Sequence, residues 1–146
     1  MKGLIIFDFN RTLYEPENKA TFRGVREFLD DYSKVYTLAL IGKGDEKRKF
    51  LIEKLDIEKY FMNLILTEEK EACDFLKCLK ELNYSKEKTW SVGDRIKKEI
   101  LISNKLGLKT IWFRNGKFSS EIPIRSEEYP NFTVESFQDI RKIIPL

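Results

Sequence analysis

The sequence predicts an α/β protein, a Rossmann-like three-layer sandwich in which helices cover both faces of a central parallel sheet. Short apolar runs alternate along the chain with stretches whose apolar residues recur at helical spacing. The first of these runs, Leu4 to Phe7, lacks polar alternation, as do strands that are buried on both faces. Two of these runs lead into an aspartate, at the end of the strand where open α/β sheets keep their ligand crevices.

Strands are expected at the apolar runs. The first begins almost at the start of the chain, where an unbroken run from Leu4 to Phe7 ends abruptly on Asp8. The expected strands are residues 4–7, 35–41, 63–66, 89–92 and 109–113, with 132–134 as a short edge strand.

Helices are expected between the strands, at residues 22–33, 45–55, 67–82, 96–107 and 136–144. Asp45 is the expected N-cap of the second helix, and Gly107 the expected C-cap of the fourth. The third is expected to open at Thr67, with Lys70 in its first turn. Residues 14–21 and 114–131 are expected to be loops, and a loop as long as the second is usually functional or mobile.

The composition suits one domain, residues 1–146, because 42% hydrophobic and 13% aromatic residues can fill one core. The formal charge of +3 is too small to indicate nucleic-acid binding. Cys73 and Cys78 have neither the pattern of a disulfide framework nor that of a zinc site, and no apolar stretch approaches membrane-spanning length. We therefore expect a cytoplasmic protein without a membrane partner.

The chain contains no histidine. This excludes Ser-His-Asp and Cys-His catalysis, histidine-ligated zinc and histidine general bases. Any catalysis must therefore use carboxylates, lysines, hydroxyls or a hard metal ion bound by oxygen atoms.

The strand and loop of residues 4–13 carry the strongest motif, Leu-Ile-Ile-Phe-Asp-Phe-Asn-Arg-Thr-Leu. They resemble the first motif of the haloacid dehalogenase (HAD) superfamily, a hydrophobic strand followed by Asp-x-Asp-x-Thr-Leu. Asn10 stands in place of the second Asp. Residues 38–45 resemble the second motif, a strand ending on Thr or Ser, with Gly42 in the hydroxyl position.

Two later segments extend the resemblance over nearly the whole chain. Lys70 falls where the family's third-motif lysine is expected, after the third strand. Gly93-Asp94 and Glu99 resemble the fourth motif, a Gly-Asp pair followed five residues later by a second acid. The resemblance implies a HAD-like α/β domain whose first strand is central, beside the second and the fourth.

The resemblance also implies a chemistry. Asp8 would attack a phosphoryl group and form an aspartyl-phosphate, and Mg²⁺ would neutralise the charge beside it. The implied metal ligands are Asp8, Asp94 and the backbone carbonyl of Asn10, with Glu99 orienting Lys70 or the waters of the metal. The implied phosphate-binding residues are Thr12, Gly42, Lys43 and Lys70, among which Lys43 competes with Lys70. The resemblance thus implies a hydrolase of phosphate esters that acts on a phosphorylated substrate.

Two positions depart from the family pattern. Asn10 cannot transfer a proton, and a positioned acid–base group contributes roughly 10²–10⁴-fold to a rate. Gly42 removes a hydroxyl donor, and a hydrogen bond to a charged group is worth about 1.5–3 kcal/mol. We therefore expect a slow or altered phosphohydrolase or phosphotransferase. The alternative is a catalytically silent HAD-like module that binds a phosphorylated ligand or a protein partner.

Simpler interpretations stay open for several of these residues. Asp94 could cap a helix, Glu99 could be a solvated helix residue, and Arg11 is either a phosphate contact or a surface charge. Attack by Asp8 on carbon, as in dehalogenases, is disfavoured because Lys70 with the two later acids forms a phosphate-and-magnesium site.

No segment between the motifs is long enough for a cap domain. Residues 14–34 separate the first motif from the second strand, and residues 43–62 precede the third strand. We therefore expect a capless member with an open crevice, which accepts large or macromolecular phosphorylated substrates or borrows a neighbouring subunit of a homo-oligomer as its lid. Residues 114–131 are the one segment that could cover the site.

Overall fold

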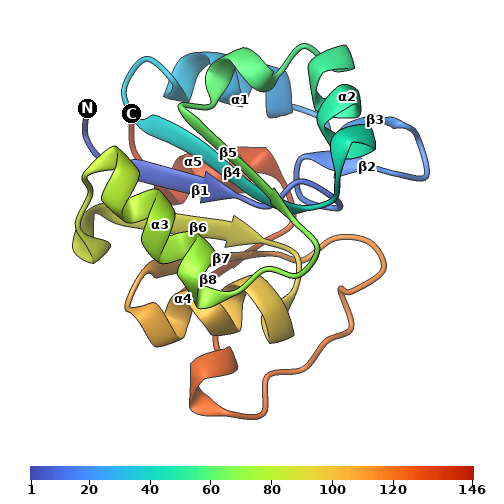
Figure 1. Cartoon of the computed structure of the whole chain (residues 1–146). Helices are drawn as coiled ribbons and strands as arrows, with labels where there is room; N and C mark the ends of the chain where they lie inside the picture. Colours follow the sequence, from blue (N-terminus) through green and yellow to red (C-terminus); the bar gives the residue numbers. More distant parts are fainter.

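The computed structural model describes residues 1–146 and is built on a six-stranded sheet in the order β5-β4-β1-β6-β7-β8 (Figure 1). Every pairing within it is parallel, and β1 lies between β4 and β6, so the expected central first strand is confirmed. The strands are β1 (Leu4–Phe7), β4 (Thr37–Lys43), β5 (Asn63–Thr67), β6 (Thr89–Gly93), β7 (Lys109–Phe113) and β8 (Phe132–Val134).

Helices cover both faces of the sheet, as a parallel sheet requires. They are α1 (Val25–Tyr32), α2 (Glu46–Lys54), α3 (Ala72–Leu82), α4 (Leu101–Leu106) and α5 (Phe137–Ile143), with short helical turns η1 (Glu58–Tyr60), η2 (Lys86–Lys88), η3 (Ile96–Ile100) and η4 (Ser126–Glu128). Figure 1 shows α1, α2 and α5 on one side of the sheet and α3 with α4 on the other. None of these helices combines the length and the apolar composition that a membrane crossing needs.

Alternate residues of β1 serve the two faces. Ile5 and Phe7 belong to the core under α1, α2 and α5, whereas Leu4 and Ile6 belong to the core under α3. All four are buried. This burial on both sides explains why the sequence of β1 shows no polar alternation. It also fixes the position of β1, and therefore that of Asp8, which directly follows the strand.

The register aligns the carboxyl ends of the central strands. Phe7, the last residue of β1, lies opposite Leu40 of β4 and Val92 of β6. Residues that follow these positions therefore meet at one edge of the sheet. Asp8, Lys43 and Asp94 are among them.

Two sequence predictions were wrong in this region of the fold. The helix expected from residue 67 begins only at Ala72, because Thr67 still pairs in β5 and a reciprocal cap between Glu71 and Asp74 sets the helix start. Lys70 therefore lies before the helix and not in its first turn. The loop expected at residues 14–21 contains a small antiparallel hairpin, β2 (Tyr14–Glu15) with β3 (Ala20–Thr21).

The segment 114–131 is irregular, as expected, but it is fastened to the rest of the protein. The Arg114 guanidinium donates to the Ser119 carbonyl at 2.9 Å, and the buried Glu128 carboxylate accepts from the N–H of Ile124 at 2.9 Å. Asn104 of α4 donates to the carbonyls of Glu127 and Tyr129. Hydrogen bonds within the segment and to α4 thus stabilise this conformation.

Candidate active site

Asp8 is held in place from three directions. Its N–H donates to the Val92 carbonyl at 3.0 Å, which extends the β1–β6 ladder by one residue. Its Oδ1 accepts from Lys70 Nζ at 2.6 Å, and its Oδ2 accepts from the hydroxyl of Thr12 at 3.3 Å. The side chain is only 7% exposed. The carboxylate is therefore oriented before any ligand arrives.

Lys70 joins Asp8 to Glu99. Its ammonium lies 2.5 Å from Glu99 Oε1, and the other oxygen of Glu99 accepts from the N–H of Arg95 at 3.0 Å. Both oxygens of Glu99 are thus engaged, one by Lys70 and the other by the backbone of Arg95. Glu99 lies in the π-helical turn η3, a form that recurs at functional sites.

Gly93 is required by this arrangement. A β-carbon on Gly93 would lie 2.8 Å from Glu99 Oε2 and 3.0 Å from the Glu99 Cβ. Any other residue at this position would therefore push Glu99 away from Lys70, which gives a steric reason for the Gly-Asp pair at the end of β6.

Asp94 completes the acidic group. It is 3% exposed, and its backbone carbonyl accepts from the indole N–H of Trp112 at 2.9 Å. Oxygen atoms of Asp8, Asp94 and Glu99 lie within 4.8 Å of one another. Three carboxylates so close, with one lysine, leave excess negative charge when all are ionised.

The pKa values reflect this excess. Burial, followed by the charges of Asp8 and Glu99, raises the pKa of Asp94 to about 9. Burial and the charge of Asp8 also raise the pKa of Glu99. Burial alone would lower the pKa of Lys70, but the charges of Asp8 and Glu99 outweigh it and raise this pKa above its usual value. A buried group of oxygen donors short of positive charge fits a hard divalent cation such as Mg²⁺.

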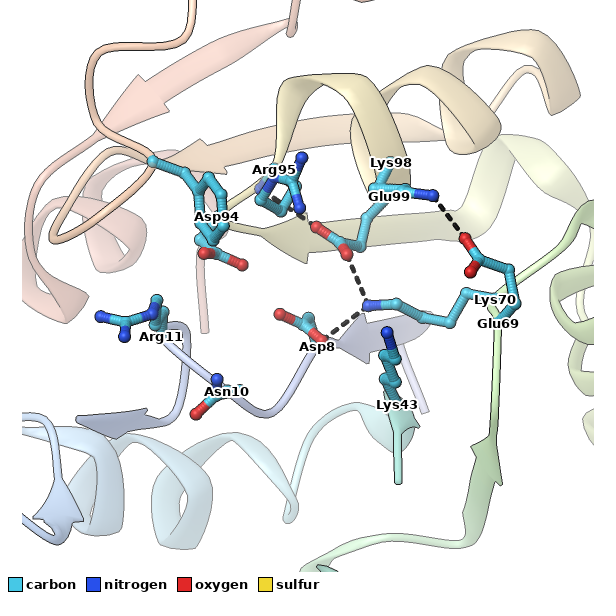
Figure 2. Close-up of a pocket in the computed structure, with 11 residues that line it drawn as sticks. Asp8, Asn10, Arg11, Lys43, Glu69, Lys70, Asp94, Arg95, Lys98 and Glu99 are labelled. Carbon is cyan, nitrogen blue, oxygen red and sulfur yellow. Dashed lines mark hydrogen bonds and ion pairs between the residues drawn. The ribbon is translucent and has the colours of Figure 1, made fainter. Parts of the chain in front are cut away.

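These residues line a cavity of about 240 Å³ (Figure 2). Of the residues expected from the sequence, Asp8, Asn10, Lys43, Lys70, Asp94 and Glu99 are on its wall. Thr12 is fully buried and holds Asp8, so it does not reach the cavity. A β-carbon on Gly42 would lie between Leu40 and Leu66, at 3.3 and 3.4 Å. The Cβ of Phe9, the residue after Asp8, lies 3.5 Å from the same position.

Five further residues line the cavity: Arg11, Glu69, Arg95, Lys98 and Phe118. Arg11, which the sequence left open between a phosphate contact and a surface charge, thus lies at the site and pairs with Glu17. Glu69, Arg95 and Lys98 could have been predicted from the sequence, because each is next to Lys70, Asp94 or Glu99 in the chain. Phe118 gave no signal, since it lies in the irregular segment.

Phe118 brings the segment 114–131 to the cavity. The Arg95 guanidinium lies 3.8 Å from the centre of the Phe118 ring, and Arg95 also pairs with Glu121 at 3.4 Å. The expectation of an open crevice therefore holds only in part. The cavity is open to solvent, but the segment 114–131 forms one of its walls through Phe118.

Comparison with known structures identifies this fold. A haloacid dehalogenase-like hydrolase from Streptococcus pneumoniae superposes with a TM-score of 0.77, at 13% identity, over 97% of each chain. A HAD hydrolase from Bacillus subtilis, solved bound to magnesium, superposes with a TM-score of 0.75, at 14% identity, over 88% of this chain and 57% of its own. A family model described as HAD-hydrolase-like matches residues 71–140, which include Asp94 and Glu99. The chain shares the fold of these haloacid dehalogenase-like (HAD-like) hydrolases and matches their family model in residues 71–140.

Curated relatives of this chain are named glyceraldehyde 3-phosphate phosphatase. The protein from Pyrococcus abyssi is 30% identical over 115 residues, and that from Pyrococcus furiosus is 24% identical over 115 residues. Each match covers 75% of this chain and 48% of the relative. The chain thus spans about half the length of the curated relatives it matches.

Proposed function

We propose that this chain is a Mg²⁺-dependent phosphohydrolase or phosphotransferase whose nucleophile is Asp8. The observation that carries the proposal is the position of Lys70, whose ammonium lies 2.6 Å from Asp8 and 2.5 Å from Glu99. A nucleophilic carboxylate cannot approach a phosphate dianion unless positive charge neutralises both. The phosphatase names of the curated relatives support the same class of reaction.

The proposed reaction has two steps. In the first, an Oδ atom of Asp8 bonds to phosphorus, and the bond from phosphorus to the leaving oxygen breaks. In the second, a water oxygen bonds to phosphorus, the bond to Asp8 breaks, and inorganic phosphate leaves with Asp8 restored. An alcohol in place of water gives phosphotransfer. Lys70 would neutralise the phosphoryl oxygens beside Asp8 in both steps, while Thr12 and Glu99 hold Asp8 and Lys70 in position.

Asp8, Asp94 and the Asn10 carbonyl are the residues that would hold Mg²⁺. The bound ion would supply positive charge opposite the transferring phosphoryl group. Glu99 is less suited to direct coordination, because Lys70 and the Arg95 N–H occupy its two oxygens.

Asn10 sets the expected rate. In the first step the leaving oxygen has to take its proton from solvent, and in the second no side chain at residue 10 can deprotonate the water. The loss is worth roughly 10²–10⁴-fold. The chemistry would therefore favour phosphate esters with good leaving groups.

A screen of phosphate esters with Mg²⁺ tests the proposal on three proteins: wild type, Asn10→Asp and Asp8→Asn. Wild type should show slow release of phosphate, Asn10→Asp faster release, and Asp8→Asn none. Activity that survives in Asp8→Asn would refute the assignment of the nucleophile.

A second candidate is favoured by Asn10 itself. A HAD module without its acid–base residue could retain a phosphorylated ligand or partner without turning it over. If wild type and Asn10→Asp are both inert across the panel, yet bind phosphate esters in the presence of Mg²⁺, this binding function replaces the catalytic one.

A further inference from the structure

Lys43 is the one cation on the cavity wall without an acidic partner. The wall carries Arg11, Lys43, Lys70, Arg95 and Lys98. Four of them form ion pairs: Arg11 with Glu17, Lys70 with Asp8 and Glu99, Arg95 with Glu121, and Lys98 with Glu69. The charge of Lys43 is therefore available to a ligand.

Lys43 points into the site from the end of a core strand. It is the last residue of β4 and pairs in register with Thr67 of β5, so its backbone is fixed. Figure 2 shows its side chain rising from β4 toward Asp8 and Lys70. An anion bound near Lys43 would thus lie beside the position proposed for the reacting phosphate.

The same lysine lines a second cavity. This neighbouring groove, of about 490 Å³, is lined by Lys43, Gly44, Asp45, Lys47, Arg48 and Glu68. Lys47 and Arg48 form no ion pair. Asp45 accepts from the N–H of Lys47 at 3.0 Å as the cap of α2. The groove is thus lined by the cations Lys43, Lys47 and Arg48 and by the acids Asp45 and Glu68, so its positive charge exceeds its negative charge.

Arg48 is held in this groove by its neighbours. Its guanidinium lies 5.0 Å from the centre of the Phe9 ring, and Phe9 directly follows Asp8 in the chain. A β-carbon on Gly44 would lie 2.5 Å from the Arg48 Cβ, so only glycine lets the two backbones approach this closely. Contacts with Phe9 and Gly44 thus position the guanidinium of Arg48.

We infer that the substrate carries a second anionic group, a carboxylate or a phosphate on its leaving group, which binds between Lys43 and Arg48. The inference rests on the proposed function, because it takes the reacting phosphate to lie at Asp8 and Lys70. Every other cation of the wall is in an ion pair, so a second anion is attracted most by the side of the cavity that carries Lys43 and Arg48. Because Lys43 belongs to both cavities, the second anion is a few bonds from the reacting phosphate, which describes a small phosphorylated acid or a bisphosphate.

Two pairs of matched esters test the inference. Phosphoglycolate and ethyl phosphate differ by a carboxylate in place of a methyl group. Ethylene glycol bisphosphate and hydroxyethyl phosphate differ by the second phosphate. The readout is the ratio of kcat/KM within each pair, so a general loss of activity in a variant cancels out.

Wild type should prefer the member with the extra anion, and Lys43→Gln and Arg48→Gln should each reduce the preference by about 10-fold or more, the loss expected for a charged hydrogen bond. Lys54→Gln is the matched control, because it removes the same charge from the exposed far end of α2, about 9 Å along the helix from Arg48. A preference in the carboxylate pair alone, or in the bisphosphate pair alone, identifies the second group. Equal kcat/KM within both pairs, or ratios that both variants leave unchanged, would overturn the inference.

Failure of the proposed function is separable from failure of this inference. If no ester is turned over, calorimetric titration of phosphoglycolate and of ethyl phosphate in the presence of Mg²⁺ gives the same comparison by affinity. Tighter binding of phosphoglycolate that is lost in Lys43→Gln supports the second anion site in an inert protein. Equal affinities, or no binding of either compound, overturn it.

Discussion

The carboxylate of Glu121 accepts a hydrogen bond from the backbone N–H of Ile96 at 3.0 Å, across 25 residues of sequence. Ile96 is the first residue of η3, whose turn carries Glu99. Glu121 also lies 3.4 Å from the Arg95 guanidinium. The segment 114–131 is thereby tied to the turn that orients Lys70, so its conformation is coupled to the site.

Replacing Glu121 should weaken both the fold and the site. Glu121→Ala leaves the Ile96 N–H and the Arg95 guanidinium without their acceptor, at a cost of about 1–3 kcal/mol in the free energy of unfolding. It should also lower kcat/KM, because Arg95 and Phe118 lose their anchor at the cavity wall. Denaturant unfolding and phosphate release measure the two effects. Glu127→Gln, in the same segment and exposed, is the control, and identical behaviour of the two variants would show that the Glu121 contact is unimportant.

Lys70 should matter for stability as well as for catalysis. Its side chain is 8% exposed and neutralises two buried acids. Lys70→Met leaves those charges uncompensated, and breaking a buried pair in this way typically costs about 3–5 kcal/mol. Mg²⁺ should restore part of the loss, because an ion bound at this site would stabilise only the folded state and would supply positive charge.

Unfolding by urea with and without Mg²⁺ measures the effect of Lys70→Met. Lys80→Met, on the exposed face of α3, is the matched control and should leave the unfolding free energy nearly unchanged. Equal stabilities of the two variants in metal-free buffer would contradict the role given to Lys70.

The central part of the site could be predicted because it depends on strand positions. The largely hydrophobic runs predict β1, β4 and β6, and parallel pairing then brings Asp8, Lys43 and Asp94 to one edge of the sheet. The start of α3 was misplaced because Thr67 is an ordinary helix-opening residue, whereas the cap that forms uses Glu71 and Asp74. The prediction therefore put Lys70 in the helix. Lys70 still follows β5 closely, so its predicted place in the site did not depend on where the helix begins.

The wall of the cavity could not be predicted in the same way. Phe118 and Glu121 lie in a segment without periodicity, and their places depend on contacts with Arg95 and Ile96 that no local pattern encodes. The effect of Gly42 on phosphate binding stays a prediction. A β-carbon there would contact Leu40, Leu66 and Phe9, the residue that follows Asp8.

Mg²⁺ binding should release a proton. Burial and the charges of Asp8 and Glu99 raise the pKa of Asp94 from 3.8 to about 9, so the metal-free folded protein keeps this proton at neutral pH. The unfolded chain loses it near pH 3.8, so between these two values the folded state binds more protons. The stability of the metal-free protein therefore falls as the pH rises through that window.

Mg²⁺ binds the ionised carboxylate of Asp94. At pH values below the raised pKa, the affinity for Mg²⁺ should therefore increase roughly tenfold for each unit by which the pH is raised. Calorimetry in two buffers of different ionisation enthalpy counts the released proton directly. Asp94→Asn should bind Mg²⁺ weakly and release none. An affinity for wild type that does not change with pH would show that Asp94 is already ionised without the metal.

The phosphorylated form of Asp8 should be long-lived. An aryl phosphate with a good leaving group needs little protonation, so Asp8 can attack it although Asn10 cannot act as an acid. Hydrolysis of the aspartyl-phosphate needs a base for the water, and Asn10 cannot supply one. Intact mass spectrometry after rapid mixing with the aryl phosphate should therefore show a phosphoryl adduct that persists, and Asp8→Asn should show none. Asn10→Asp should clear the adduct and raise turnover by roughly 10²-fold or more. An adduct that disappears equally fast in wild type and in Asn10→Asp would mean that another group activates the water, and Asn10 would then not be what limits this enzyme.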